Sequence, residues 1–229
     1  MDWITILAAA VVAVITMYLI YRYFNQTLDL GLSSAITIVG PISDGKVQFD
    51  SPIAIPKSFN QAQGMTFSYA CWVKINDFSY RYGAPKVIFT KGPIDLTSMC
   101  PALFLDPTSN SLIVKIDTFG GVEAIPVGNI PAKKWVHVAI AVSQDSVDIY
   151  IDGNLYYHHS LVNVPKQNAE TVHTNIAGGF DGSIAGLTYY NYLLTPDSLA
   201  AIIASAPKTS PDTTPLPQYR DKTFWINHE

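Results

Sequence analysis

The sequence is poor in charge and in cysteine. Only 14% of its 229 residues are charged, and 14 basic against 18 acidic side chains give a net charge of −4. Because no basic run occurs, a groove that follows a phosphate backbone is not expected, and nucleic acid is excluded as a partner. The two cysteines, Cys71 and Cys100, each lie in or beside an apolar run. They fit two buried thiols in a reducing compartment or a single bridge, and not an extracellular disulfide framework.

Patterns that mark common catalytic centres are also missing. The chain shows no serine–histidine–aspartate order, no glycine-rich loop that would cradle a phosphate and no Cys-x-x-Cys pair. What it has in abundance is 15 prolines, 14 glycines and 13 tyrosines. This composition favours a loop-rich all-β domain. The length leaves room for one sizeable domain with appendages.

The clearest strand signal lies in the middle of the chain, at residues 134–157. Apolar residues occupy every second position of two neighbouring segments: Val136, Val138, Ile140 and Val142, then Val147, Ile149 and Ile151. Such alternation of β-branched residues is typical of half-buried strands. Residues 144–146 supply a polar turn, and residues 152–154 (Asp-Gly-Asn) tolerate the positive φ of a tight turn. The sequence therefore predicts an antiparallel meander.

Further strands and one soluble helix are expected on both sides of the meander. Apolar runs predict a strand pair over 47–55, strands at 67–75, 86–90, 102–105 and 112–116, and two short strands within 176–190. A helix should begin after Thr195, which suits an N-cap, with Pro196 in its first turn and Pro207 at its end. The chain divides into segments 1–24, 25–42, 43–206 and 207–229.

Segment 1–24 predicts a transmembrane anchor. From Trp3 to Tyr21 the chain runs for 19 uncharged, mostly aliphatic residues, close to the about 20 that a helix needs to cross a bilayer. Trp3 at one end and Tyr18 and Tyr21 at the other suit the two membrane interfaces. A cleaved signal peptide is the alternative, but its basic start and shorter apolar run are absent.

The charges that flank this anchor indicate its orientation. Asp2 precedes the apolar run and Arg22 follows it, so the positive-inside tendency places the following domain in the cytosol. The one glycosylation-type motif, at residues 25–27, would be pressed against the membrane. We therefore expect a single-pass membrane protein with a lipid bilayer as one partner and residues 25–42 as a connector.

Residues 207–229 differ in composition from the rest of the chain. Four prolines fall within 11 residues beside threonine, serine and aspartate, which favours an extended segment. The segment ends in a cluster of aromatic and basic residues: Tyr219, Arg220, Phe224 and Trp225. Either it is a disordered tail or, because such tails are poor in aromatics, it is an arm that docks on a partner through these four residues.

Several motifs together resemble one family. They are GKVQFD at 45–50, MTFSYACWVK at 65–74, WVHVA at 135–139 with IYIDGN at 149–154, and FDGSIAGL at 180–187 followed by residues 189–196. Their order and spacing are similar to those of the concanavalin A-like, laminin-G-type (pentraxin-like) jelly rolls. The resemblance covers about residues 43–206 and implies an all-β sandwich of two antiparallel sheets, here with one transmembrane helix and one short C-terminal helix.

The resemblance also says which site residues to look for. The glucanase branch needs paired carboxylates on one strand, whereas the only glutamates here are Glu123, Glu170 and Glu229, so no enzyme is expected. The lectin branch often holds Ca²⁺ through loop oxygens. Candidate ligands are Asp106, Asn110, Asp152 and Asp181, although turns already account for most of them. Trp72 and Trp135 fit core aromatics better than sugar-stacking platforms, and we predict no catalytic, cofactor or metal residues.

Two functions follow from this architecture. The first is a non-enzymatic structural protein that bridges a membrane to a protein shell, similar to minor capsid proteins of large double-stranded DNA viruses, with capsid proteins as partners and the virion as location. The alternative is a membrane-displayed, lectin-like module that binds glycan with or without Ca²⁺.

Overall fold

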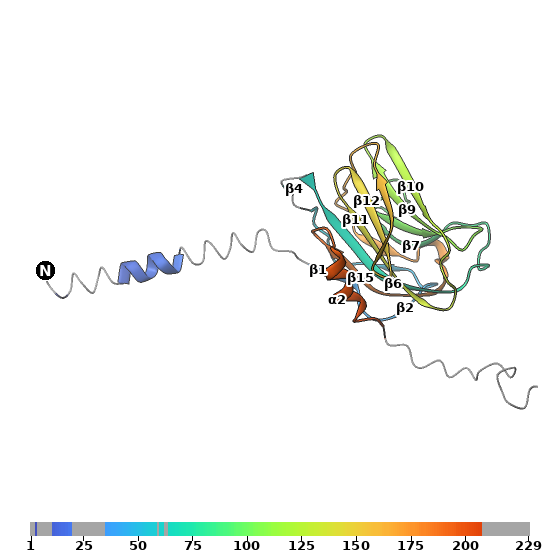
Figure 1. Cartoon of the computed structure of the whole chain (residues 1–229), viewed down its shortest axis with the longest axis horizontal. Coiled ribbons are helices and arrows are strands. Elements are labelled where there is room, and N and C mark those ends of the chain that lie inside the picture. Colours follow the sequence, from blue (N-terminus) through green and yellow to red (C-terminus); the bar gives the residue numbers. More distant parts are fainter. Residues whose placement is uncertain (1–2, 4–10, 20–34, 59, 62–63, 208–229) are drawn as a thin grey trace, which may run out of the picture.

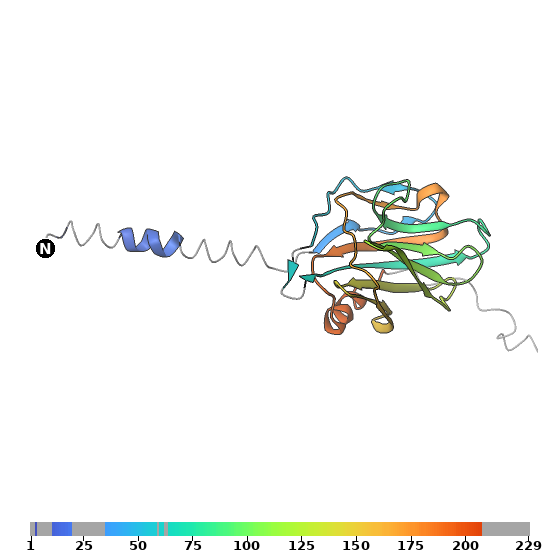
Figure 2. The same cartoon turned by 90° about the horizontal axis from the view of Figure 1, so that it is seen from above.

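The computed structural model is a sandwich of two antiparallel β-sheets (Figures 1 and 2). It describes residues 3, 11–19, 35–58, 60–61 and 64–207. The predicted all-β sandwich is thereby confirmed, together with the short helix near the end of the described chain.

The first sheet, here called sheet A, has seven strands. Its order is β1, β15, β6, β11, β12 and β13, and β2 pairs in addition with β15. The strands are β1 Ala35–Val39, β2 Ser43–Asp44, β6 Phe67–Asp77, β11 Trp135–Val142, β12 Ser146–Ile151, β13 Asn154–Ser160 and β15 Asp181–Tyr190. β6, β11 and β12 follow the predicted alternation, and positive φ at Asp152 and Gly153 closes the predicted turn into β13.

The second sheet, sheet B, has six strands in the order β10, β9, β8, β7, β14 and β3. Its strands are β3 Phe49–Asp50, β7 Lys86–Lys91, β8 Ala102–Leu105, β9 Leu112–Thr118, β10 Gly121–Val127 and β14 Val172–Thr174. A small separate hairpin joins β4 Asn60–Gln61 to β5 Gly64–Met65, and a 3₁₀ turn, Ile176–Gly178, precedes β15.

The core lies between the two sheets and is aliphatic and aromatic. Val136, Val138, Ile140 and Val142 of β11 all point into it, each at most 2% exposed. Cys71 and Cys100 are free thiols in this core, and burial raises the pKa of each to about 12. Both thiols are therefore protonated and unreactive at neutral pH.

The outer face of sheet A is partly covered by helix α2, Pro196–Ile203 (Figure 2). Leu199 of the helix is fully buried against small side chains of β6 and β11, namely Ala70, Ala139 and Ala141. The alanines leave room for a helix where larger residues would hold it off the sheet. Packing of an apolar stripe on this face thus explains why so short a helix is stable.

The predicted N-cap of α2 is confirmed in its geometry. The Thr195 hydroxyl accepts the Ser198 N–H, and the Ser198 hydroxyl accepts the Thr195 N–H at 2.8 Å. Thr195→Ala should lower the free energy of unfolding by about 1 kcal/mol, because it removes one of these bonds. Thr195→Ser keeps the hydroxyl and should be near neutral in the same urea titration. Equal losses for the two variants would contradict the cap.

The predicted strands differ from the structure in two places, and some strands of the structure were not predicted. Residues 47–55 form no strand pair, since only Phe49–Asp50 is a strand and Pro52 interrupts the apolar residues that follow. Residues 181–190 form one strand instead of two, because β1 and β6 pair along both of its sides. Strand β10 was not predicted. It lies at the edge of sheet B, where its Pro126 costs no ladder bond to a further strand. Sheet A also extends into the predicted connector, through β1.

The predicted anchor and arm fall largely outside the described residues. Trp3 and residues 11–19 are helical, with Trp3 and Tyr18 exposed. Tyr21 and Arg22 of the anchor, and Tyr219, Arg220, Phe224 and Trp225 of the arm, lie outside the described part. Within the described chain, no helix combines the length and apolarity needed to cross a bilayer. Anchor and arm both remain predictions from sequence.

Candidate functional site

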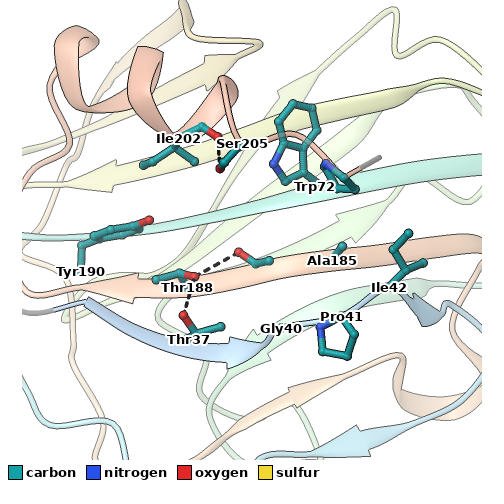
Figure 3. A pocket seen from close by; sticks show the side chains of 12 residues that line it. Thr37, Gly40, Pro41, Ile42, Trp72, Ala185, Thr188, Tyr190, Ile202 and Ser205 are labelled. Carbon is teal, nitrogen blue, oxygen red and sulfur yellow. Dashed lines mark hydrogen bonds between the residues drawn. The ribbon is translucent and has the colours of Figure 1, made fainter. Parts of the chain in front are cut away.

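A cavity of about 420 Å³ opens on the outer face of sheet A, beside the C-terminal end of α2 (Figure 3). We call it the Trp72 pocket. It is lined by Thr37, Gly40, Pro41, Ile42, Trp72, Ala185, Gly186, Thr188, Tyr190, Ile202, Ser205 and Pro207. Its volume lies within the range of small-molecule sites in proteins.

Three neighbouring strands form the floor of the pocket. Trp72 comes from β6, Thr188 and Tyr190 from β15, and Thr37 from β1. These residues alternate with core residues, so their side chains point away from the sandwich interior. Each of Trp72, Thr188 and Tyr190 is only 8% exposed, so the floor is sheltered and its orientation is set by strand register.

A bulge in β15 shapes the floor beneath the indole of Trp72. The pairing of β15 with β6 shifts register between Ala185 and Thr188, and Gly186 lies in the bulge with φ of 62°. A Cβ on Gly186 would be 3.5 Å from Trp72 Cδ1, an ordinary contact. The requirement for glycine is therefore conformational, since few other residues adopt positive φ without strain.

The walls of the pocket come from two segments far apart in the sequence. Ile202 and Ser205 stand on the helical side, and Pro41 and Ile42 on the opposite side (Figure 3). A backbone hydrogen bond from the Gly186 N–H to the Gly40 carbonyl, 3.4 Å long, ties the second wall to the floor.

The polar groups of the lining are hydroxyls with unused capacity. Thr188 Oγ1 donates to the Gly186 carbonyl at 3.1 Å and lies 3.5 Å from Thr37 Oγ1. Ser205 Oγ donates to the Ile202 carbonyl at 2.6 Å. A hydroxyl that donates one bond still has two acceptor lone pairs. Burial raises the pKa of the Tyr190 phenol, so this group is a neutral donor at physiological pH.

Among the residues that the structure describes, no charged side chain lines the pocket. Together with the indole and the aliphatic walls, the hydroxyls suit a ligand that is uncharged, partly apolar and rich in hydroxyl groups. An indole face accepts C–H groups of such a ligand, and hydroxyl groups on the rim fix its orientation.

The loop oxygens considered as Ca²⁺ ligands are engaged elsewhere and do not converge. Asp106 Oδ1 accepts the N–H groups of Thr108 and Ser109, each at 2.8 Å. Asp152 Oδ1 accepts the His137 N–H at 2.8 Å, and Asp181 pairs with the ammonium of Lys46 at 3.0 Å. Asn110 contributes a backbone carbonyl to the Ile130 N–H. Among the described residues, no three histidine, cysteine, aspartate or glutamate side chains group to hold a metal.

Comparison with known families identifies the fold. A sequence profile of the concanavalin A-like lectin/glucanases superfamily, laminin G type, matches residues 44–200, more than half of the chain. The chain belongs to this superfamily. The resemblance seen in the four motifs is thereby confirmed.

Solved structures similar to this superfamily member include three neurotoxin domains. The receptor binding domain of botulinum neurotoxin D has a TM-score of 0.55 at 13% identity, over 76% of this chain and 48% of that one. A serotype D ligand binding domain in complex with N-acetylneuraminic acid gives 0.56 at 12%, over 76% and 46%. The serotype G binding domain gives 0.52 at 14%, over 75% and 50%.

At these identities the likeness concerns the fold alone, and the chain spans about half the length of each neurotoxin domain. A search of curated proteins finds no match.

Of the two glutamates that the structure describes in this superfamily member, Glu123 has its carboxylate in structural contacts. Glu123 Oε2 lies 2.9 Å from His159 Nε2, and Glu123 Oε1 accepts the Val162 N–H at 3.0 Å. Glu170 lies in the loop before β14, and Glu229 falls outside the described residues. The absence of an enzyme remains a prediction.

The pocket brings together residues that sequence reasoning did not join. Trp72 was expected in the core, but it lies on the outer face of sheet A, where it lines the pocket and meets the His137 ring at 5.1 Å. Trp135 is partly exposed and lies at the start of β11. Alternation with Phe67, Tyr69 and Cys71 already placed Trp72 opposite the core, and that signal could have found it.

Proposed function

We propose that this chain is a non-catalytic, lectin-like module whose Trp72 pocket binds a neutral saccharide. The observation that carries the proposal is a cavity of about 420 Å³ whose described lining is uncharged and whose floor carries an indole and several hydroxyls. Membership of a superfamily that includes lectins supports the proposal without locating the site. The pocket is lined by side chains that strand register and the α2 contact hold in place, so binding needs little ordering.

The lining favours neutral sugars over acidic ones. The serotype D neurotoxin domain is described in complex with N-acetylneuraminic acid, which carries a carboxylate. The described lining of the Trp72 pocket has no lysine or arginine, so a carboxylate there would lose water without gaining a charged partner from these residues. We therefore expect selectivity for uncharged monosaccharide units or their oligomers.

Thr188→Val should weaken saccharide binding about tenfold, because it removes a hydroxyl from the pocket floor while keeping the side-chain shape. Calorimetry with saccharides found on a glycan array measures the dissociation constant. Thr90→Val is the matched control: Thr90 is also buried on a strand, but it lies on β7, outside the pocket.

Three results would count against the proposed site. They are no neutral glycan bound on the array, equal losses for the Thr188 and Thr90 variants, or a preference for sialylated glycans. Titration with and without Ca²⁺ should give the same dissociation constant, because the lining residues that the structure describes include no carboxylate. Loss of binding on chelation would point to a different, metal-dependent site.

The apolar stretch from Trp3 to Tyr21 favours a second role, which is compatible with the first. We propose a single-pass membrane protein whose domain faces the cytosol and bridges the membrane to a protein shell, as in a virion, with arm 207–229 as the docking segment. Removing residues 208–229 should reduce incorporation into such an assembly. Unchanged incorporation would argue against the arm, and saccharide binding measured in parallel separates the two roles.

A further inference from the structure

Strand register shows which loops share an end with the start of β1. Ala35 pairs with Tyr190, Tyr190 pairs with Ser68, and Ser68 pairs with Ala141. The beginning of β1, the beginning of β6 and the end of β11 therefore lie at one end of the sandwich, which we call the β1 end. The loop 78–85, which joins the end of β6 to the start of β7, lies at the opposite end.

Two loops project at the β1 end and are joined to each other. The segment after β13 begins at Leu161, whose N–H donates to the Asp145 carbonyl in the turn that follows β11. The tip of the β9–β10 hairpin then meets this segment, because the Phe119 N–H donates to the Val164 carbonyl at 3.1 Å. Sheet A and sheet B thus contribute one loop each to a common tip.

This tip exposes four large apolar side chains. Val162 is 83% exposed, Phe119 75%, Val122 49% and Val164 41%. Within residues 35–207, Val162 and Phe119 are the two most exposed large apolar residues of the described chain. Single exposed apolar residues are ordinary, but a group on joined loops marks an interaction surface. We call these four residues the apolar tip.

Polar contacts fix the backbone of the two loops that carry the apolar tip. Glu123 accepts the Val162 N–H and lies against His159, and the Thr118 hydroxyl donates to the Gly121 carbonyl at 2.6 Å. The backbone of Thr118 also bridges to Pro165. Since both loops are fixed by their own hydrogen bonds, the exposure of Phe119 and Val162 is a property of the fold.

We propose that the apolar tip inserts into the interfacial region of a lipid bilayer. The inference rests on the proposed membrane anchor at residues 1–24. Only residues 25–34 separate that anchor from Ala35, so at most about 40 Å of extended chain lies between the bilayer and the β1 end. The end of the sandwich that carries the tip is the end held near the membrane, and apolar groups gain by leaving water there.

A probe at the tip tests the proposal in the full chain, reconstituted into phosphatidylcholine vesicles. Val162→Cys takes an environment-sensitive fluorophore selectively, because Cys71 and Cys100 are 1% and 3% exposed. Tyr82→Cys is the matched control, since Tyr82 is 69% exposed and lies in loop 78–85 at the opposite end. We expect a blue-shifted probe at position 162, and roughly twofold or stronger quenching by doxyl-labelled lipid than at position 82.

Vesicle flotation of the same samples separates failure of the anchor from failure of the tip. If the chain floats but quenching is equally weak at positions 162 and 82, the proposed insertion of the apolar tip is wrong and the proposed anchor is not affected. A chain that does not float overturns both. A position-162 probe that is shielded in lipid-free detergent, increasingly at higher protein concentration, indicates a second protein copy as the occupant and also overturns the proposal. Saccharide binding does not depend on any of these outcomes.

Discussion

Acidification from pH 7 to pH 4 should cost the sandwich about 3 kcal/mol of stability through His137. This side chain on β11 is fully buried beside Trp72, and neither ring nitrogen has a hydrogen-bond partner among the described residues. Burial lowers the pKa of His137 to about 4, and the nearby Asp152 carboxylate opposes that effect only in part. The folded protein therefore holds a neutral imidazole that the unfolded chain would protonate.

Stability falls on acidification because the pKa of His137 is lower in the folded protein than in the unfolded chain. Above the ordinary histidine pKa of about 6.5 the imidazole is neutral in both states, and its contribution is fully present. As the pH falls toward 4, the unfolded chain takes up a proton that the folded chain does not, so stability is lost across that window. The folded protein also loses stability in acid through four aspartates whose carboxyl groups have a lowered pKa. They are Asp50, Asp77, Asp95 and Asp106.

The variant His137→Phe isolates the contribution of the imidazole, because the aspartates remain in both proteins. Urea unfolding at several pH values should give a difference between wild type and variant that is flat above pH 7 and changes by about 3 kcal/mol down to pH 4. NMR should show the His137 ring titrating near pH 4. A ring that titrates near 6.5, with parallel stability curves, would refute the assignment.

Replacing Phe180 by alanine should lower the free energy of unfolding by about 3–5 kcal/mol. Phe180 directly precedes β15 in the sequence, and its ring is fully buried. The ring fills the space left by two glycines. A Cβ on Gly182 would lie 2.7 Å from its Cε2, and a Cβ on Gly45 would lie 2.9 Å from its Cζ. The Phe180 N–H donates to the Gly45 carbonyl at 3.0 Å, so the cavity would open where the segment after β2 is tied to β15.

The matched variant is Phe180→Leu, which keeps most of the buried volume and should lose clearly less. Denaturant unfolding at pH 7 measures both, and an unchanged dependence on denaturant shows that only stability has altered. If alanine and leucine cost the same, or alanine costs less than about 1 kcal/mol, the ring does not fill this space as described.

Much of the sandwich could be predicted from sequence because its central strands are simple. β11 and β12 carry a β-branched residue at nearly every inward position, and the Asp152-Gly153 turn carries its own conformational signal. Strand β10 was not predicted because Glu123 and Pro126 interrupt the alternation of apolar residues. An edge strand tolerates both, but being at an edge depends on the order of the strands in the sheet.

The pocket was harder to predict, for a physical reason. Its floor joins β1, β6 and β15, and its walls join Pro41 to Ser205, so only long-range pairing assembles it. An aromatic residue such as Trp72 normally indicates burial, and here it is buried. It is sheltered on the outer face of sheet A and not by the opposite sheet. The alternation along β6 indicates that face, but no local pattern shows that the indole is covered there.

The pairing of β1 with β15 has a consequence for how the protein folds. Sheet A joins the first described strand of the sandwich to its last, and β15 also forms one flank of β6. Until β15 has left the ribosome, β6 lacks a neighbour on that side and its ladder groups stay unpaired. Pairing between strands so far apart in the sequence gives the domain a high contact order, which implies slow folding, on the scale of milliseconds to seconds. The domain therefore matures only after nearly all of its sequence has been synthesised.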